Sequence, residues 1–330
     1  MKALITSKSP LNNIPKNIES LRDINWFAED SHPLTITKDI LINLFSKRSL
    51  LFSKNAIHDE THIVSTFDNF DRLLFECNHS ARRISDSYYY TEQKLLRTHM
   101  TCREHVYISS GLDSFLVYGK VFRRDEIDSS HFPVFHQLEG VSLFDVDTFS
   151  REVVSKEESQ PEYSQEVTSA VVGHLRETLG GVIGDLFGNS AIRWPKTHFP
   201  FTFPSFEAEV QYQGKWLEVL GAGVLMKKVL DQCYVEPHNK IGWAFGIGLE
   251  RIAMVLFDIP DIRWFWSQDE RFLSQFRAGT ITKFRPFSCY PPLLRDLSFY
   301  LPEDSVIHDN DVFDVIRQSG GDVVESVKLV

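Results

Sequence analysis

Several polar side chains in one short part of this chain suit a ligand that carries both phosphate and ammonium groups. Arg123 and Arg124 follow an apolar run, and Gln137 and Glu139 stand two residues apart shortly afterwards. Arginine donates hydrogen bonds in pairs and keeps its charge, which suits a phosphate or a carboxylate. Residues two apart on a strand face the same side, so Gln137 and Glu139 together can hold an ammonium group. The competing interpretation is a salt-bridged surface hairpin.

The elements that carry these side chains are predicted to form a β-hairpin. Residues 115–122 are apolar, aromatic or β-branched, which favours a strand that ends at the paired arginines. Residues 126–132 form an acidic, serine-rich loop that contains His131. Residues 134–141 return as a second strand, in which Phe135 precedes the polar pair. Hairpins of this kind are common, and they bring the ends of two strands together.

A second stretch, 242–258, reads as a glycine-bounded strand that runs into an amphipathic helix. Its apolar residues recur at helical spacing: Ile247, Leu249, Ile252, Ala253, Leu256 and Phe257. Arg251 falls in the first turn of this helix, near the positive end of the helix dipole. A cation is unfavourable there unless it faces an anion that the free N–H groups also bind.

A third stretch, 198–224, combines an aromatic cluster with a second predicted hairpin. Phenylalanines crowd around Pro200 and Pro204, and Phe206 is assigned to the core. Alternating residues from 206 to 212, the turn signal Gln213-Gly214 and a returning run to residue 224 complete the hairpin. Gly221 and Gly223 are expected to leave room for a ligand near the sheet.

Composition narrows the class of protein. The chain has 330 residues, of which 42% are hydrophobic, enough for one large domain and a smaller one. A formal charge of −10 argues against broad, nonspecific binding to nucleic acid. Four scattered cysteines without a CxxC pair disfavour a zinc site or a disulfide framework and indicate reduced thiols inside a cell. No membrane-spanning run or secretory signal is visible, so no membrane partner is expected.

The motifs together resemble those of a known family. FRRD at 122–125 and GIGLER at 246–251 resemble motifs two and three of class II aminoacyl-tRNA synthetases. FPVFHQLEG at 132–140, HFPFTFPSFE at 198–207 and GWAFGIGLER at 242–251 resemble the single-chain, organellar phenylalanine–tRNA ligases. The resemblance extends from about Asn25 to the C-terminus. It implies an α+β fold with an antiparallel sheet flanked by helices, and a monomer in the mitochondrial matrix or in another organelle such as a plastid.

The resemblance also implies a reaction and the residues that carry it out. Phenylalanine is activated with ATP and Mg²⁺ and then transferred to tRNA(Phe). Arg123 is expected to bind the α-phosphate and the substrate carboxylate, and Arg251 the γ-phosphate of a bent ATP. Phe135 is expected to stack on adenine. Asp125 is expected to contact the amino edge of adenine, His131 to lie over the phosphates, and Glu218 to contact the nucleotide and the metal. The full set of further ATP contacts is Asp125, Ser130, His131, Phe132 and Glu218.

The implied phenylalanine pocket draws on four segments. Gln137 and Glu139 bind the α-ammonium, Phe199 and Phe201 flank the phenyl ring, and Ala244 sets the depth. The full set is His99, Thr101, Cys102, Arg103, Glu104, Gln137, Leu138, Glu139, Phe199, Phe201, Ala244 and Phe245. Two residues depart from the family pattern: Thr101 replaces a serine, and Glu104 replaces a glutamine and adds a charge beside the substrate.

Three parts of the chain are expected: an N-terminal extension over 1–31, the catalytic core over 32–283, and a smaller unit over 284–330. Motif one is expected to begin with a helix near residue 33 and to end near 65–83. The last unit resembles the first half of a ferredoxin-like anticodon-binding domain, with a strand at 293–301, a helix at 311–319 and a strand at 323–330. That fold requires β-α-β-β-α-β, so the unit is expected to be truncated, or the rest of the domain to have been lost.

Two other functions are compatible with the sequence. A synthetase-like paralogue would bind an amino acid or a nucleotide without charging tRNA. A ligase of the same type could instead adenylate a different amino acid.

Overall fold

The computed structural model describes residues 11–330 except 50–51, 53, 150, 152–155, 189, 237, 288–289 and 301–306. The first ten residues of the expected N-terminal extension therefore lie outside the described residues. The rest of that extension contains α1 (Lys16–Asp23), whose Ile18 is buried in the core.

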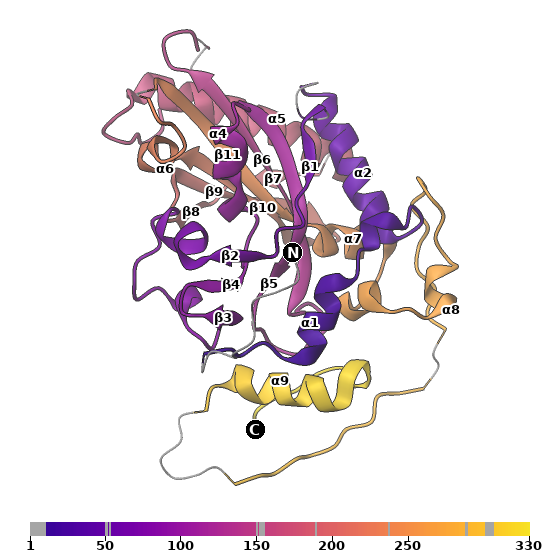
Figure 1. The fold of residues 1–330 in the computed structure, drawn as a ribbon. Helices are drawn as coiled ribbons and strands as arrows, with labels where there is room; N and C mark the ends of the chain where they lie inside the picture. Colours follow the sequence, from indigo (N-terminus) through magenta and orange to yellow (C-terminus); the bar gives the residue numbers. More distant parts are fainter. Residues whose placement is uncertain are drawn as a thin grey trace.

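An eight-stranded sheet forms the centre of the molecule (Figure 1). Its strand order is β1-β5-β6-β11-β10-β9-β7, with β8 paired to β9. Every pairing is antiparallel except that of β1 with β5. The bounds are β1 (Ala56–His58), β5 (Ser114–Phe122), β6 (Val134–Asp145), β7 (Ile192–Arg193), β8 (Lys196–Phe199), β9 (Thr202–Tyr212), β10 (Lys215–Leu225) and β11 (Lys240–Gly248). The predicted α+β architecture and both predicted hairpins are confirmed.

Alternation along the strands divides the sheet into two faces. Leu116 and Phe245 pack into the main core, whereas their neighbours Val117 and Ala244 belong to a smaller cluster on the opposite face. This follows from the period of two along a strand, which sends successive side chains to opposite sides. Gly140 lies beside Phe245, and a Cβ at residue 140 would stand 2.5 Å from that ring. Glycine is therefore required there for the aromatic ring to pack against the sheet.

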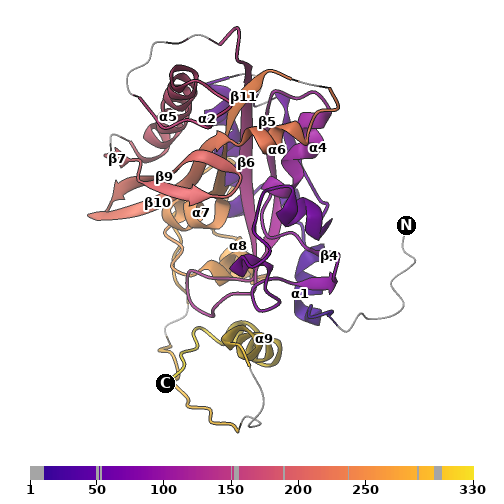
Figure 2. The same cartoon turned by 90° about the vertical axis from the view of Figure 1, so that its left-hand side faces the viewer.

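Helices cover the main-core face. The principal ones are α2 (Pro33–Ser46), α5 (Gln165–Phe187) and α7 (Leu249–Phe257), and α2 contacts both of the others (Figure 2). Short helices α4 (Glu104–Ser109) and α6 (Lys227–Asp231) contribute Ile108 and Leu230 to the cluster on the other face. The helix α8 (Glu270–Leu273) follows α7 in the chain.

The expected motif one begins as predicted and then differs. The helix near residue 33 is α2, with His32 capping its first turn. The strand that joins the central sheet after it is β1, at residues 56–58, rather than a strand near 65–83. Residues 65–83 instead cover part of a separate three-stranded sheet and two short helical turns. That sheet has the order β2-β4-β3, formed by β2 (Ile63–Ser65), β3 (Tyr89–Thr91) and β4 (Lys94–Leu96).

In the described part of the C-terminal segment, α9 (Asp309–Gly320) and the 3-10 turn Gly321–Val323 lie between two stretches without strand pairing. The helix predicted at 311–319 is therefore present. The strands predicted at 293–301 and 323–330 are not formed over the described residues 290–300 and 324–330, and residue 301 lies outside them. A strand needs a neighbouring strand to pair with, and these stretches lie beside none within the described chain.

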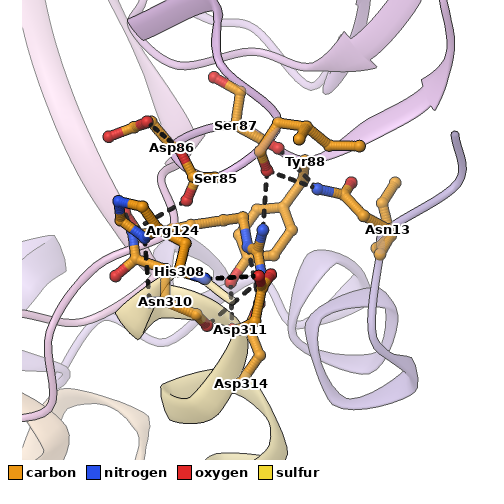
Figure 3. Close-up of polar contacts among 12 residues, drawn as sticks. Asn13, Ser85, Asp86, Ser87, Tyr88, Arg124, His308, Asn310, Asp311 and Asp314 are labelled. Carbon is orange, nitrogen blue, oxygen red and sulfur yellow. Dashed lines mark hydrogen bonds and ion pairs between the residues drawn. The ribbon is translucent and has the colours of Figure 1, made fainter. Parts of the chain in front are cut away.

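A buried ion-pair network attaches α9 to the core (Figure 3). Arg124 Nε donates to Asp314 Oδ2 at 2.8 Å, and Arg124 Nη2 donates to Asp311 Oδ1 at 2.7 Å. The same guanidinium donates to the carbonyl of Ile84, and Tyr88 donates its hydroxyl to Asp314. Buried pairs of this geometry are strongly destabilising to break, because the remaining charge loses its partner. The two adjacent arginines of the FRRD motif thus have separate roles.

Arg317 adds a second attachment on the same helix. Its guanidinium donates to the backbone carbonyls of Asp125 and Glu126, the first residues of the loop between β5 and β6. The N–H of Val327 donates to the carbonyl of Ile127 in the same loop. The C-terminal segment is therefore joined directly to the loop that was predicted to bind a nucleotide.

Candidate active site

A single cavity of about 710 Å³ collects most of the predicted site residues. It lies on the sheet face that carries Gln137, Glu139 and Ala244, and residues from β6, β9, β10, β11 and α7 line it. Of the predicted residues, it is lined by His99, Thr101, Glu104, Arg123, Asp125, Ser130, His131, Phe132, Phe135, Gln137, Glu139, Phe199, Phe201, Glu218, Ala244, Phe245 and Arg251.

One end of the cavity is positively charged and aromatic. Arg123 follows β5, and its Nε donates to the carbonyl of Thr98 at 2.9 Å, which fixes the side chain. Its guanidinium lies 5.2 Å from the centre of the Phe135 ring, on the neighbouring strand. The ring and the cation together form a surface that suits a planar base and a phosphate.

The second arginine of this end is held by a carboxylate. Arg251 is the third residue of α7, and its Nη1 lies 3.3 Å from Glu218 Oε2 on β10. Both side chains are half-exposed, so the pair contributes little to stability. The arrangement places a half-exposed cation and a half-exposed carboxylate on the wall of the cavity.

The loop between β5 and β6 closes one side of the cavity. His131 Nδ1 lies 2.8 Å from Asp128 Oδ2, and Asp128 also accepts the N–H groups of Ser130 and His131. Partial burial alone would lower the pKa of His131, but the hydrogen bond to Asp128 raises it above the usual value. Phe132 stacks on Trp266 at 5.5 Å between ring centres. The loop thus presents an imidazole whose protonation Asp128 favours.

The other end of the cavity is acidic. Gln137 accepts the N–H of Met100 at 3.1 Å, and Glu139 lies two residues further along the same face of β6. Burial raises the pKa of Glu139 to about 7, although a hydrogen bond from Thr101 and the charge of Arg123 act in the opposite direction. Glu104 is also buried here, in contact with Glu139. This end brings Gln137 and Glu139 together on one face of the strand.

His99 borders the cavity but has no free nitrogen to offer a ligand. Its Nε2 lies 3.1 Å from the carbonyl of Asn69, and its Nδ1 accepts the N–H of Cys102. Burial lowers the pKa of His99 to about 3, and the charge of Arg123 adds to this effect. The imidazole is therefore neutral and fixed, and it contributes its ring rather than a hydrogen bond.

Aromatic rings line the cavity beside the acidic end. Phe199 and Phe201 stack with 5.8 Å between ring centres, and Phe201 lies 6.1 Å from Phe75. Phe75 in turn stacks on His99 at 5.8 Å. Four rings thus form an apolar wall that suits a flat apolar side chain.

Two predicted pocket residues serve the protein interior instead. Cys102 is buried, and its thiol donates to the carbonyl of His99. Arg103 donates to Asp59 at 2.8 Å, and this buried carboxylate also binds Arg97. Burial alone would raise the pKa of Asp59, but hydrogen bonds from Arg103 and from the Tyr107 hydroxyl, together with the charge of Arg97, hold it well below its usual range. Neither Cys102 nor Arg103 is among the residues that line the cavity, and the side chains of both have protein partners instead.

Strand parity turns the side chains of two further predicted residues towards the main core. Leu138 and Phe245 alternate with Glu139 and Ala244, so they face the main core. Leu138 does not line the cavity. Phe245 borders it, but its ring stacks on Phe45 at 4.7 Å. Both residues support the sheet rather than contact a ligand through their side chains.

The glycines of β10 do not leave the open space that the sequence suggested. A Cβ at Gly221 would stand 2.8 Å from the Phe199 ring, and one at Gly223 would stand 2.7 Å from Thr202 and from the carbonyl of Pro204. Gly246 has a similar role, because a Cβ there would lie 3.3 Å from Glu139 Oε1. Glycine is needed at these three positions because neighbouring protein atoms occupy the space that a Cβ would fill.

Three site residues were missed from the sequence. Phe75 lines the cavity from a segment outside the quoted motifs, and Glu207 lines it from the last position of HFPFTFPSFE. Glu250 accepts the N–H of His136 and lies 2.7 Å from His136 Nδ1, both groups being almost fully buried. This contact ties α7 to β6 and fixes the turn before Arg251. In the sequence, only the position of Glu250 inside the GIGLER motif could have indicated this role.

Two further structural facts bear on the kind of site. Glu207 and Glu218 place carboxylates on the cavity wall, a donor type that suits a hard divalent cation. Over the described residues, no helix combines the length and hydropathy that crossing a bilayer requires.

Comparison with known proteins assigns this architecture to a family. Residues 20–154 and 164–276 match the model of the tRNA synthetases class II core domain (F). The chain is 41% identical over 329 residues to the chloroplastic/mitochondrial phenylalanine–tRNA ligase of Arabidopsis thaliana, covering 99% of this chain and 73% of that protein. It is 39% identical to the mitochondrial enzyme of Mus musculus and 36% identical to that of Saccharomyces cerevisiae, in each case over 96% of this chain, and over 74% and 81% of those proteins.

Proposed function

This chain belongs to the phenylalanine–tRNA ligases of the class II tRNA synthetase family, and from this premise we propose that it activates L-phenylalanine with ATP and transfers it to tRNA in organellar translation. The observation that supports the proposal most strongly is the single cavity. It brings two arginines, an acidic end and an aromatic wall together from separate elements.

The first half-reaction requires positioning and neutralisation of charge. The substrate carboxylate attacks the α-phosphate of ATP, and pyrophosphate leaves. Arg123 binds the α-phosphate and the attacking carboxylate, since its guanidinium is fixed beside Phe135, on which the adenine stacks. Arg251 exchanges Glu218 for the γ-phosphate. Both arginines act on negative charge that builds up as the bond to pyrophosphate breaks.

The amino acid occupies the opposite end of the cavity. Glu139 and Gln137 bind its α-ammonium, and the stacked rings of Phe199 and Phe201 form the wall for its phenyl ring. Ala244 limits the depth on the sheet side, because it carries a methyl group on the face of β11 where Gly242, Gly246 and Gly248 have no side chain. The ammonium group and the phenyl ring of phenylalanine thus contact different parts of the cavity wall.

The donor set fits Mg²⁺ as a companion of ATP. Glu218 and Glu207 would hold the ion together with phosphate oxygens, and the ion would neutralise charge on the phosphates. Glu218 is then the residue that changes partner, since in the free protein it pairs with Arg251.

The remaining features follow from the family. The chain uses ATP, an amino acid and tRNA as substrates. We propose that it acts as a monomer in the mitochondrial matrix, with a plastid as the alternative, because its relatives are named as mitochondrial or chloroplastic enzymes.

Pyrophosphate exchange tests the proposal directly. The full chain is incubated with ATP, Mg²⁺, labelled pyrophosphate and each of the twenty amino acids in turn, and charging of an organellar tRNA(Phe) transcript is measured in parallel. We expect exchange that depends on phenylalanine and is strongest with it. Exchange with a different amino acid, or none with any, would overturn the assignment.

A further inference from the structure

Two buried carboxyl groups meet at the amino-acid end of the cavity. Glu104 is the first residue of α4, and Glu139 lies near the middle of β6. Each side chain is 3% exposed, each lines the cavity, and the two are in hydrogen-bonding contact. Two ionised carboxylates would only accept hydrogen bonds, so this contact requires a proton on one of them.

The surroundings of the two groups are unequal. The Thr101 hydroxyl donates a hydrogen bond to Glu139, and Arg123 lies nearby, so both favour the ionised form of Glu139. Glu104 Oε1 is buried without a hydrogen-bond partner within the described chain. The neighbouring cation Arg103 is bound to Asp59 and does not compensate Glu104.

The charges around the pair assign the proton to Glu104. Burial and the negative charge of Glu139 raise the pKa of Glu104 well above its usual value. The titratable groups that interact with either carboxyl are Arg123 and the thiols of Cys102 and Cys233. Burial raises the pKa of both thiols, that of Cys233 to about 12, so both are neutral. The one positive charge in this set, on Arg123, is close to Glu139 and favours the ionised form there.

Building on the proposed function, we propose that Glu104 is a neutral carboxylic acid in the working enzyme, and that its O–H donates a hydrogen bond to the ionised Glu139. The pair then presents one negative charge, rather than two, to the α-ammonium of the amino acid. Glu104 is a positioning residue, because it fixes the carboxylate that contacts the substrate. It also keeps the site from holding a second carboxylate charge that no cation balances.

Two substitutions distinguish this role from that of a second anion. Glutamine is neutral, has a similar shape and retains a donor, so Glu104→Gln should keep the KM for phenylalanine in pyrophosphate exchange within about threefold. Alanine removes the donor, and a hydrogen bond to a charged group is lost, so Glu104→Ala should raise that KM about tenfold or more. The KM for ATP should stay unchanged in both variants. Circular dichroism checks that each variant is folded.

Infrared spectroscopy reports the proton independently of activity. The carbonyl stretch of a protonated carboxylic acid should be present in the full chain at pH 8 and absent in Glu104→Gln. Glu157→Gln is the matched control, because Glu157 is also buried but is paired with Arg176 at 2.8 Å. That variant should keep the band.

The outcomes separate this inference from the proposed function. A band that persists in Glu104→Gln, or a KM for phenylalanine that rises as much with glutamine as with alanine, overturns the neutral-acid role. Absence of phenylalanine-dependent exchange in the unsubstituted chain contradicts the proposed function instead, and the infrared result still decides the state of Glu104. If Glu104→Ala does not fold, the glutamine variant and the spectrum are sufficient.

Discussion

Arg251 Nη1 lies 3.3 Å from Glu218 Oε2, so the cation assigned to the γ-phosphate is paired with a protein carboxylate in the free chain. The pair joins the start of α7 to the middle of β10 across the mouth of the cavity. Because both side chains are half-exposed, the ion pair is worth at most about 1 kcal/mol, and a phosphate can displace the carboxylate.

Arg251→Ala should therefore separate activity from stability. We expect phenylalanine-dependent pyrophosphate exchange to fall about a hundredfold or more, because one preorganised cation is lost from the transition state. The unfolding free energy should change by less than about 1 kcal/mol. Arg271→Ala is the control, since Arg271 forms an exposed pair with Asp269 away from the cavity. Near-normal exchange in folded Arg251→Ala would remove Arg251 from the mechanism.

Substitution of the two adjacent arginines of the FRRD motif should affect different properties: Arg123 the activity and Arg124 the attachment of α9. Each variant is therefore the control for the other. Arg123→Ala should abolish exchange while α9 stays attached. Arg124→Ala should release α9, because Asp314 and Asp311 lose their buried partner, at a cost of about 3–5 kcal/mol for that contact. Trypsin digestion followed by mass spectrometry measures the release, through faster cleavage after Arg317. Equal protease resistance in both variants would contradict the assignment.

Ala244→Gly should deepen the amino-acid pocket. Ala244 lies on the cavity face of β11 opposite Gly223. Substitution by glycine removes the Ala244 methyl group from the cavity wall. We expect exchange with para-substituted phenylalanines to appear while phenylalanine remains a substrate. Ala208→Gly, a buried substitution in the main core, should not change the amino-acid preference. If Ala244→Gly still rejects the substituted analogues, the pocket floor lies elsewhere.

Glu139 should make the free protein less stable as the pH rises. Its pKa is about 7 in the fold, against a usual value of 4.5, so the folded chain binds this proton more tightly than the unfolded chain does. Stability is then lost between about pH 4.5 and 7, and the loss is complete above pH 7. Glu139→Gln should raise the unfolding free energy by roughly 1–3 kcal/mol at pH 8 and little at pH 4.5, while greatly weakening phenylalanine binding. Equal effects at both pH values in urea unfolding would contradict this expectation.

The partly buried His62 should act with the opposite sign. Burial lowers the pKa of His62 to about 3, and the charges of Arg97 and Lys120 add to this effect. An unfolded histidine titrates near 6.5, so stability is fully present above that pH and is lost as the pH falls towards 3. We expect His62→Gln to reduce the loss of unfolding free energy between pH 7 and 5 by roughly 2 kcal/mol. An unchanged pH dependence in urea titrations would show that His62 is not neutral in the fold.

The parts of the site that could be predicted were those set by local pattern. Alternation placed Gln137 and Glu139 on one face of a strand, and helical spacing placed Arg251 in the first turn of α7. The same alternation could have excluded the side chains of Leu138 and Phe245, which were included because they belong to motif segments. Their parity on β6 and β11 shows that contiguous motif residues do not all face the ligand.

The parts that could not be predicted depend on partners far away in the chain. Arg103 is committed to Asp59 and Arg124 to α9, and neither partner is near in sequence. Phe75 and Glu207 reach the cavity only because the sheets and loops bring them there. No strand formed on either side of α9 over the described residues, because a strand propensity without a pairing partner does not determine structure.

The attachment of the C-terminal segment also changes the entropy of nucleotide binding. The loop after β5 would sample many conformations if only its own sequence held it. Arg317 and Val327 hold the backbone of its first residues, and Arg124 anchors the strand exit from which it starts. Part of the ordering that ATP would otherwise impose is thus completed when the chain folds. The loop is therefore preorganised before ATP binds. Binding of ATP then costs less conformational entropy, which makes the free energy of binding more favourable.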